Sequence, residues 1–345
     1  MNILLNVIFV IVSFSILIII HEFGHFALAK LNGVKVEEFA IGMGPKLFGI
    51  RGKETLYAFR VIPIGGYVKM LGEGEDEEVP VDDERSFSNK SPLRRLSIVA
   101  AGPIMNFVLA IVLFAIIGHM RGFSVPIVSE VIPNSPAIKA GIKPGDTITK
   151  VNNKKINTWE DVIGQINMSK GSPIDVQLLT NKNEQKSVSI LPIKNSKDGT
   201  YMLGICSSIV AKPSFSQSVK YGLQETGSTI KQTFQSLGMI FKGKASKNDF
   251  GGPVTILRVT WAVSKAGLMN LVLFSAFISI QLGIFNLLPF PALDGFWIFV
   301  SLYQIITKRE INKDRIGVIN TIGFALLLLL MVVVTIKDIL YPIKL

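Results

Sequence analysis

Long runs of apolar residues alternate with mixed polar segments along this chain. The first run, residues 3–29, is almost wholly Ile, Leu, Val and Phe before its polar end. Three more apolar runs cover residues 96–117, begin near residue 268, and cover residues 316–336. A helix of about 20 residues crosses a hydrocarbon core that is about 30 Å thick. The pattern therefore predicts a polytopic α-helical membrane protein with about four transmembrane helices.

Residues 122–210, between the second and third apolar runs, have a different, strand-like character. Their pattern predicts one helix and two strands, at 159–168, 174–179 and 186–191. The sequence from Val131 to Asn153, with its turns at Pro133 and Pro144, resembles a bacterial PDZ domain. The resemblance implies one inserted α/β PDZ domain, a type of domain that adds a peptide as an extra strand to a sheet edge. A spacer or gate without a peptide ligand is the alternative.

Residues 56–71 are predicted to form two strands joined through Gly65 and Gly66, a β-hairpin. Because this apolar stretch follows a membrane span, we expect the hairpin to dip into the edge of the bilayer. Open backbone is not tolerated in lipid, so such a hairpin must line a cavity within the protein.

The polar end of the first apolar run contains His21-Glu22-Phe23-Gly24-His25, an H-E-x-x-H pattern. Side chains four residues apart lie on one face of a helix, so both imidazoles can bind one Zn²⁺ while Glu22 accepts a proton from water. A charged side chain at the bilayer centre costs about 2.5–3.5 kcal/mol, so such residues are usually functional. A signal peptide is excluded because no Lys or Arg precedes Lys30.

The third apolar run is interrupted by Pro289 and Pro291, which cannot continue a helix. The chain must unwind there, and irregular backbone at that depth has to face protein or water. Asp294, in this unwound region, is predicted to be the third ligand, since a catalytic zinc takes three protein ligands and leaves a fourth position for water. An Asp-Gly turn in the protein core is the alternative, but it would bury an unpaired carboxylate.

Two further polar residues lie on the second apolar run. Asn106, in the sequence Gly102-Pro-Ile-Met-Asn106, either hydrogen-bonds a neighbouring helix or lies beside the metal site. His119 is the one histidine outside the H-E-x-x-H motif, and we expect it at the membrane interface without a catalytic task.

Composition and charge agree with a membrane protein. Of 345 residues, 49% are hydrophobic and only 18% are charged, too apolar for an ordinary soluble domain. The single cysteine, Cys206, excludes an intrachain disulfide framework and a cysteine-based zinc site. The net charge of +11 could indicate nucleic-acid binding, but no basic stripe is interleaved with aromatics. Basic residues flanking the spans explain this charge better.

The distribution of basic residues also predicts the topology. They are absent before Lys30 and frequent in the segment after it. By the positive-inside rule, both termini and the PDZ domain are extracytoplasmic, and the zinc site opens near the cytoplasmic face.

The predicted organisation has eight segments. They are 1–30, the first transmembrane helix with H-E-x-x-H; 31–93, a cytoplasmic segment with the membrane-associated hairpin; 94–120, the second transmembrane helix; 121–210, the PDZ domain; 211–266, an extracytoplasmic amphipathic helical segment; 267–306, the third transmembrane helix with its broken end; 307–315, a cytoplasmic turn; and 316–345, the fourth transmembrane helix and C-terminus.

Together these motifs resemble the bacterial site-2 protease family, in particular its regulator of sigma-E protease type. The resemblance covers essentially the whole chain. It is carried by His21-Glu22-x-x-His25, the 62–69 hairpin sequence, Gly102-Pro-x-x-Asn106, the PDZ domain, Gly252-Pro253 and Asn286-Leu-Leu-Pro-x-Pro-x-Leu-Asp-Gly295. Two departures are a single PDZ domain, where the best-known proteobacterial members have two, and Phe296, where the family often has a second glycine.

The resemblance implies a role for each matching residue. His21, His25 and Asp294 resemble the family's zinc ligands, and Glu22 resembles its general base. A second set of residues resembles the elements with which the family holds its substrate, and Asn106 is its weaker member. This set is Gly65, Gly66, Asn286, Pro289 and Asn106.

The sequence thus predicts regulated intramembrane proteolysis by a zinc metalloprotease. The expected partners are a single-span membrane substrate such as an anti-sigma factor or a remnant signal peptide, membrane lipid, and a peptide ligand of the PDZ domain; nucleic acid is not expected. The expected location is the bacterial cytoplasmic (inner) membrane. A zinc transporter would not need Glu22, and a non-catalytic PDZ membrane scaffold would not need the metal ligands; these are the two alternative classes.

Overall fold

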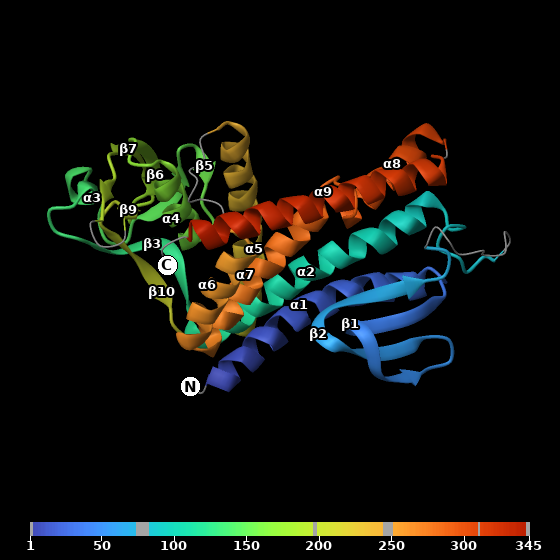
Figure 1. Cartoon of the computed structure of the whole chain (residues 1–345). Coiled ribbons are helices and arrows are strands. Elements are labelled where there is room, and N and C mark those ends of the chain that lie inside the picture. The colour runs from blue at the N-terminus through green and yellow to red at the C-terminus, as the bar shows by residue number, and fades with distance from the viewer. Residues whose placement is uncertain (1–2, 74–82, 196–198, 244–250, 310, 343–345) are drawn as a thin grey trace. The chain divides into compact units, whose positions relative to one another are not determined.

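The computed structural model describes residues 3–73, 83–195, 199–243, 251–309 and 311–342 (Figure 1). The chain divides into two compact units. Residues 1–110 and 244–345 form the first unit, and residues 111–243 form the second.

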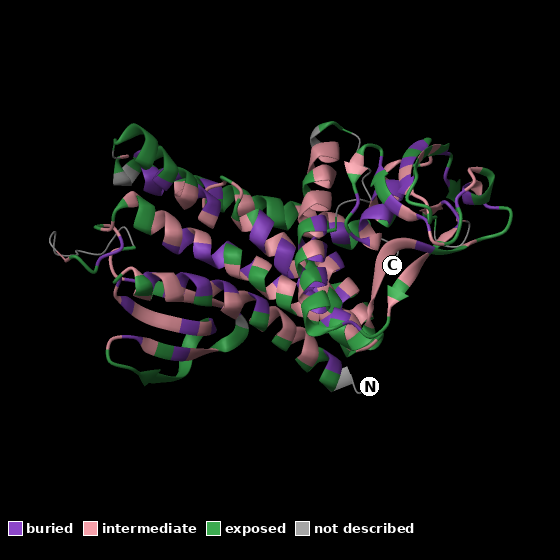
Figure 2. Ribbon diagram, turned by 180° about the vertical axis from the view of Figure 1, so that it is seen from behind, coloured by how far each residue is buried: buried purple, intermediate pink, exposed green. Residues whose placement is uncertain are grey.

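Four helices of the described chain are long and apolar enough to cross a membrane, as the four apolar runs predict. They are α1 (Ile3–Leu31), α2 (Pro92–Arg121), α7 (Leu268–Asn286) and α9 (Lys313–Leu340). Exposed residues predominate along α9 (Figure 2), as expected of a helix whose outer surface contacts lipid.

Two shorter helices, α6 (Pro253–Lys265) and α8 (Asp294–Thr307), belong to the same unit. Two N–H groups at the start of α6 are satisfied by Asp338 of α9, a residue with only 1% exposure. Its Oδ2 accepts hydrogen bonds from Gly252 N at 2.8 Å and Thr255 N at 3.0 Å. Asp338 therefore ties the start of α6 to α9, a contact that the sequence did not predict.

A small antiparallel sheet packs on α1. Its strands are β1 (Val36–Arg51) and β2 (Leu56–Met70), and the turn between them lies at residues 52–55. The prediction that a hairpin turns at Gly65 and Gly66 is therefore wrong, because both glycines lie inside β2.

Instead, β2 bends at these glycines, and its two halves pair separately with β1. Residues 56–59 pair with one side of residues 38–41, and residues 66–70 pair with the other side of the same stretch. Gly65 has φ of +96°, in the left-handed region that favours glycine, and this permits the bend. Within the described chain, the outer edge of residues 66–70 has no strand partner.

The second unit is built on a six-stranded sheet in which β10-β3-β4-β6-β7 are neighbours and β5 pairs with β4. Its strands are β3 (Phe123–Val131), β4 (Thr147–Val151), β5 (Lys154–Lys155), β6 (Ile174–Leu179), β7 (Gln185–Ile190) and β10 (Ile205–Val210). The same unit contains a short strand pair, β8 (Ile193–Lys194) and β9 (Tyr201–Met202), and the helices α3 (Pro136–Lys139) and α4 (Trp159–Met168). The predicted helix and the first predicted strand match α4 and β6; the second lies one residue later than β7.

Helix α5 (Phe215–Phe241) starts at a capping box formed by Ser214 and Gln217. Near its start, Tyr221 stacks on Phe123 with ring centroids 4.5 Å apart. Farther along, Ser228 donates to the buried carboxylate of Asp161 on α4 at 2.9 Å. The predicted amphipathic segment 211–266 thus contains two helices, α5 in the second unit and α6 in the first.

Candidate metal centre

His21 and His25 lie one turn apart on α1, and both are buried, with 9% and 8% exposure. Their Nε2 atoms are 3.2 Å apart. His25 Nδ1 donates a hydrogen bond to the Ile98 carbonyl oxygen at 2.9 Å. Since that bond places the proton of a neutral imidazole on Nδ1, it leaves Nε2 free to bind a metal.

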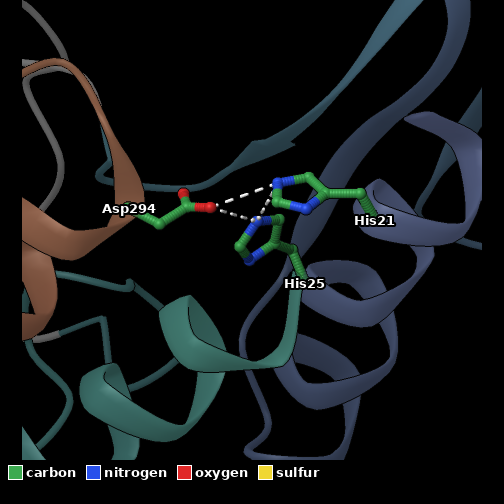
Figure 3. Close-up of side chains that lie close together, drawn as sticks. All are labelled: His21, His25 and Asp294. Carbon is green, nitrogen blue, oxygen red and sulfur yellow. Dashed lines mark hydrogen bonds and ion pairs between the residues drawn. The ribbon is translucent and has the colours of Figure 1, made fainter. Parts of the chain in front are cut away.

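Asp294 reaches the same point from the other end of the chain. Residues 287–293 are non-helical, as the two prolines require, and Asp294 is the first residue of α8 rather than part of the unwound stretch. Its Oδ2 lies 3.1 Å from His21 Nε2 and 3.5 Å from His25 Nε2 (Figure 3). Tetrahedral ligands about 2.0–2.1 Å from zinc are about 3.3–3.4 Å from one another. The three atoms thus have the spacing that one zinc ion requires.

The chemistry of these three donors also fits a cation. Asp294 Oδ2 is buried and has no hydrogen-bond partner in the described chain. A buried carboxylate oxygen facing two imidazole nitrogens is unfavourable unless positive charge balances it. Two histidines with one carboxylate is a ligand set of catalytic zinc sites, and this arrangement favours a metal site over a simple Asp-Gly turn.

Helix α2 passes directly against the two imidazoles at Gly102. A Cβ added there would lie 2.2 Å from His25 Nε2 and 2.8 Å from His21 Cε1. Gly24 allows a similar approach of α1, because its Cβ would lie 2.4 Å from the Ala101 carbonyl oxygen. From the sequence, one interpretation of Gly102 was that it allows close helix packing; that the atoms it approaches belong to the two imidazoles was not predicted.

Asn106, one turn farther along α2, is fully buried beside His21. Its side-chain amide lies 3.2 Å from His21 Nδ1, and Ser279 of α7 donates to its backbone oxygen at 2.8 Å. The nearer amide atom is Nδ2, and Oδ1 has no hydrogen-bond partner in the described chain. A metal on His21 Nε2 requires a proton on Nδ1, and the Asn106 amide turned over by 180° would accept that proton with Oδ1. The contact orients His21, a role different from the substrate contact predicted for Asn106.

A cavity of about 240 Å³ opens in front of the three donors. Glu22 lines it from α1, and Tyr67 and Val68 line it from the second half of β2. Gly66 is close enough to Glu22 that its Cβ would lie 3.5 Å from Glu22 Cγ. The edge of β2 at residues 66–68, which has no strand partner in the described chain, therefore borders the same cavity as the candidate base.

The other predicted site residues differ in how close they come to the donors. Asn286, the last residue of α7, has its Nδ2 3.5 Å from His21 Nε2. Gly65 is buried at the bend of β2, and Pro289 is exposed on the 287–293 loop. His119 belongs to the second unit, where Ser218 Oγ lies 3.4 Å from its Nδ1.

Comparison with known proteins decides the family. Residues 9–330 match the description "Peptidase family M50". The chain belongs to this family. The M50 chain is 53% identical to a protein of Clostridium acetobutylicum named as a zinc metalloprotease, over 98% of both chains, and 47% identical to another from Clostridium perfringens, over 98% and 99%. It is 30% identical to the regulator of sigma-W protease RasP of Bacillus subtilis, over 97% and 98%.

A segment covering 26% of this M50 chain also has 20% identity and a TM-score of 0.22 to the PDZ domain of an SdrC-like protein from Listeria monocytogenes, 90% of which is covered. Family membership makes the chain a zinc metalloprotease of the site-2 protease type. Its four apolar helices agree with an integral membrane protein.

Proposed function

We propose that this M50 protein hydrolyses a peptide bond within or near the transmembrane segment of a protein substrate. The observation that carries the proposal is the convergence of His21, His25 and Asp294 beside Glu22 and a strand edge that has no strand partner in the described chain. His21 Nε2, His25 Nε2 and Asp294 Oδ2 would hold the zinc. When bound, the ion supplies Lewis acidity, which polarises the scissile carbonyl and lowers the pKa of the attacking water to about 7.

Glu22 acts as the general base. Its side chain enters the cavity from the same helical turn that carries both histidines, so α1 fixes the three groups together. The Glu22 carboxylate takes the proton of the attacking water and delivers it to the leaving amine. Ile98 and Asn106 hold the two imidazole rings in orientation from α2.

The substrate presents a separate problem, because a transmembrane helix keeps its carbonyls in internal hydrogen bonds. It must unwind locally before any peptide bond can be cut. The edge of residues 66–68, which has no strand partner among the described residues, would supply replacement backbone hydrogen bonds beside Glu22, which is strand addition. Asn286, next to His21, is placed to donate to a substrate carbonyl. We assign Gly65, at the bend of β2, and Pro289, on the 287–293 loop, to the same substrate-holding elements.

The substrate class we propose is a single-span membrane protein, either an anti-sigma factor or a remnant signal peptide. The name of the Bacillus subtilis relative, a regulator of sigma-W protease, supports the first. Following the positive-inside rule, the chain lies in the bacterial cytoplasmic membrane with its termini and PDZ-like domain outside and the zinc site near the cytoplasmic face. A peptide ligand would add to the outer side of β10, which lies at one edge of the sheet.

The test compares wild type with Glu22→Gln, each purified in detergent, for bound zinc and for cleavage of a single-span substrate. Glu22 is not among the three donors, so the variant is expected to retain zinc and lose cleavage. Cleavage by Glu22→Gln at the wild-type rate would reject the assigned base. Zinc uptake by vesicles containing the wild-type protein, without proteolysis, would favour a transporter instead.

A further inference from the structure

The loop that delivers Asp294 to the metal site rests on helix α9. Residues 287–293 connect α7 to α8 without helical structure, so helical hydrogen bonds do not fix their path. The loop folds back on the start of α8: a Cβ on Gly295 would lie 2.0 Å from the Leu288 carbonyl oxygen. Because the packing is that close, a displacement of the loop must also move the residues that begin α8.

One hydrogen bond ties this loop to α9. Ala292 N donates to Asn320 Oδ1 at 2.7 Å. Ala292 has φ of +72°, a left-handed conformation that costs a residue with a Cβ about 1 kcal/mol or more unless its surroundings hold it there. The Asn320 side chain accepts from the strained peptide itself, two residues before Asp294.

A second contact fixes the distance between the loop and α9. Gly323 is buried against Pro291, and a Cβ on Gly323 would lie 2.2 Å from the Pro291 Cβ. The atoms on the Pro291 side belong to a rigid ring, which cannot rotate away. The absence of a side chain at Gly323 therefore allows the loop to sit directly on the helix.

Asn320 and Gly323 are three residues apart and thus on one face of α9. The residues around them, Ile319, Thr321, Ile322 and Phe324, are exposed. An asparagine within a candidate membrane span is unfavourable unless it is hydrogen-bonded, and such residues usually have a function. Here the polar group and the small residue point at the loop, while their neighbours face outward.

We propose that Asn320 and Gly323 are positioning residues that hold the Asp294 carboxylate at zinc-binding distance from His21 and His25. Asn320 fixes the backbone at Ala292, and Gly323 fixes the depth of Pro291. Neither residue touches the metal site. The proposal rests on Asp294 being a zinc ligand, as proposed above, and gives α9 a role in metal binding.

The test measures zinc affinity by competition with a chelator in the full-length purified protein. Asn320→Leu keeps the side-chain size but removes the acceptor, and Gly323→Ala adds the Cβ that meets Pro291. Each is expected to weaken zinc binding about 10-fold to 100-fold, the effect typical of groups that orient a ligand. Asn320→Asp retains an acceptor oxygen and is expected to recover most of the lost affinity.

Two control variants keep the result specific. Thr321→Val removes a polar group from the exposed side of α9, and Gly227→Ala adds a Cβ where no atom lies within 4 Å; both are expected to bind zinc as wild type does. Thermal unfolding of the zinc-free proteins shows whether the variants are folded. A lowered melting temperature with unchanged zinc affinity in both Asn320→Leu and Gly323→Ala would overturn the proposal, since the contacts would then be only structural.

Asp294→Ala separates this inference from the proposed function. If Asp294→Ala binds zinc as tightly as wild type, the assigned metal site itself fails. If Asp294→Ala loses zinc while Asn320→Leu and Gly323→Ala keep it, only the inference about α9 fails. Adding Asn320→Leu to Asp294→Ala is expected to cause no further loss, because both act through the same ligand.

Discussion

Gly102 offers the sharpest test of the metal centre, because an added methyl group meets both imidazoles. In Gly102→Ala the new Cβ would lie 2.2 Å from His25 Nε2, whereas ordinary contact begins at 3.4 Å. The ring or the helix must therefore move by at least about 1.2 Å. Zinc–ligand distances tolerate changes of only about 0.2 Å, so the displacement is several times larger than the site allows.

The expected effect on folding is smaller than the effect on metal binding. Alanine is favoured over glycine in a helix by about 1 kcal/mol, and overpacking costs about 1–3 kcal/mol, so the net loss of stability is at most about 2 kcal/mol. Zinc affinity should fall at least about 100-fold, equivalent to about 2.7 kcal/mol. The protein is expected to fold and to lose its zinc.

Zinc competition with a chelator, combined with thermal unfolding of the zinc-free protein, measures the two effects separately. Gly238→Ala is the matched control, because its Cβ on α5 has no atom within 4 Å. It should leave zinc affinity unchanged. Wild-type zinc affinity and proteolysis in Gly102→Ala would show that α2 does not press on the imidazoles, and the described packing of α1 on α2 would then be incorrect.

Three further results are expected. Asp338→Leu should lower the free energy of unfolding by about 0.5–2 kcal/mol, as for other lost helix caps, and Asp338→Asn by less; thermal unfolding in detergent would measure both. Burial, together with the neighbouring Glu160, raises the pKa of Glu225 to about 9 from its usual 4.5. The folded state thus retains a proton that the unfolded state releases. The free energy of unfolding should therefore fall as the pH rises from about 5 to about 9. Melting temperature measured against pH would show this fall, and Glu225→Gln should flatten the profile. Gly65→Val should straighten β2 and slow cleavage of a transmembrane helix more than cleavage of an unstructured peptide; equal slowing of the two would argue against strand addition.

The residue pattern predicted the candidate metal-binding residues better than it predicted which β-strand segments pair. The spacing of His21 and His25 requires one helix face, and the prolines before Asp294 require a broken helix, so local rules suffice for both. The bend at Gly65 was predicted to be a hairpin turn because two consecutive glycines indicate a change of chain direction. They do not determine which strand segments become neighbours. In the structure, the two halves of β2 lie on opposite sides of residues 38–41.

Residues that support the site from a distance could not be found in the sequence. Asn320 lies in a mainly apolar run, and its role is visible only from its contact with Ala292. Gly102 and Gly323 have no side chains, so their roles depend on atoms of His25 and Pro291 that come from other segments. Such contacts are tertiary, and neither periodicity nor turn chemistry encodes them.

The separation of the three proposed zinc ligands along the chain has a consequence for biosynthesis. The two histidines belong to the first helix, but the carboxylate comes from residue 294 of 345. Chains are made from the N-terminus, and their early parts can fold before synthesis ends. A ribosome-bound or prematurely terminated product that stops before α8 therefore has the two imidazoles but not the third proposed donor, so the proposed zinc site is completed only after α8 has been made.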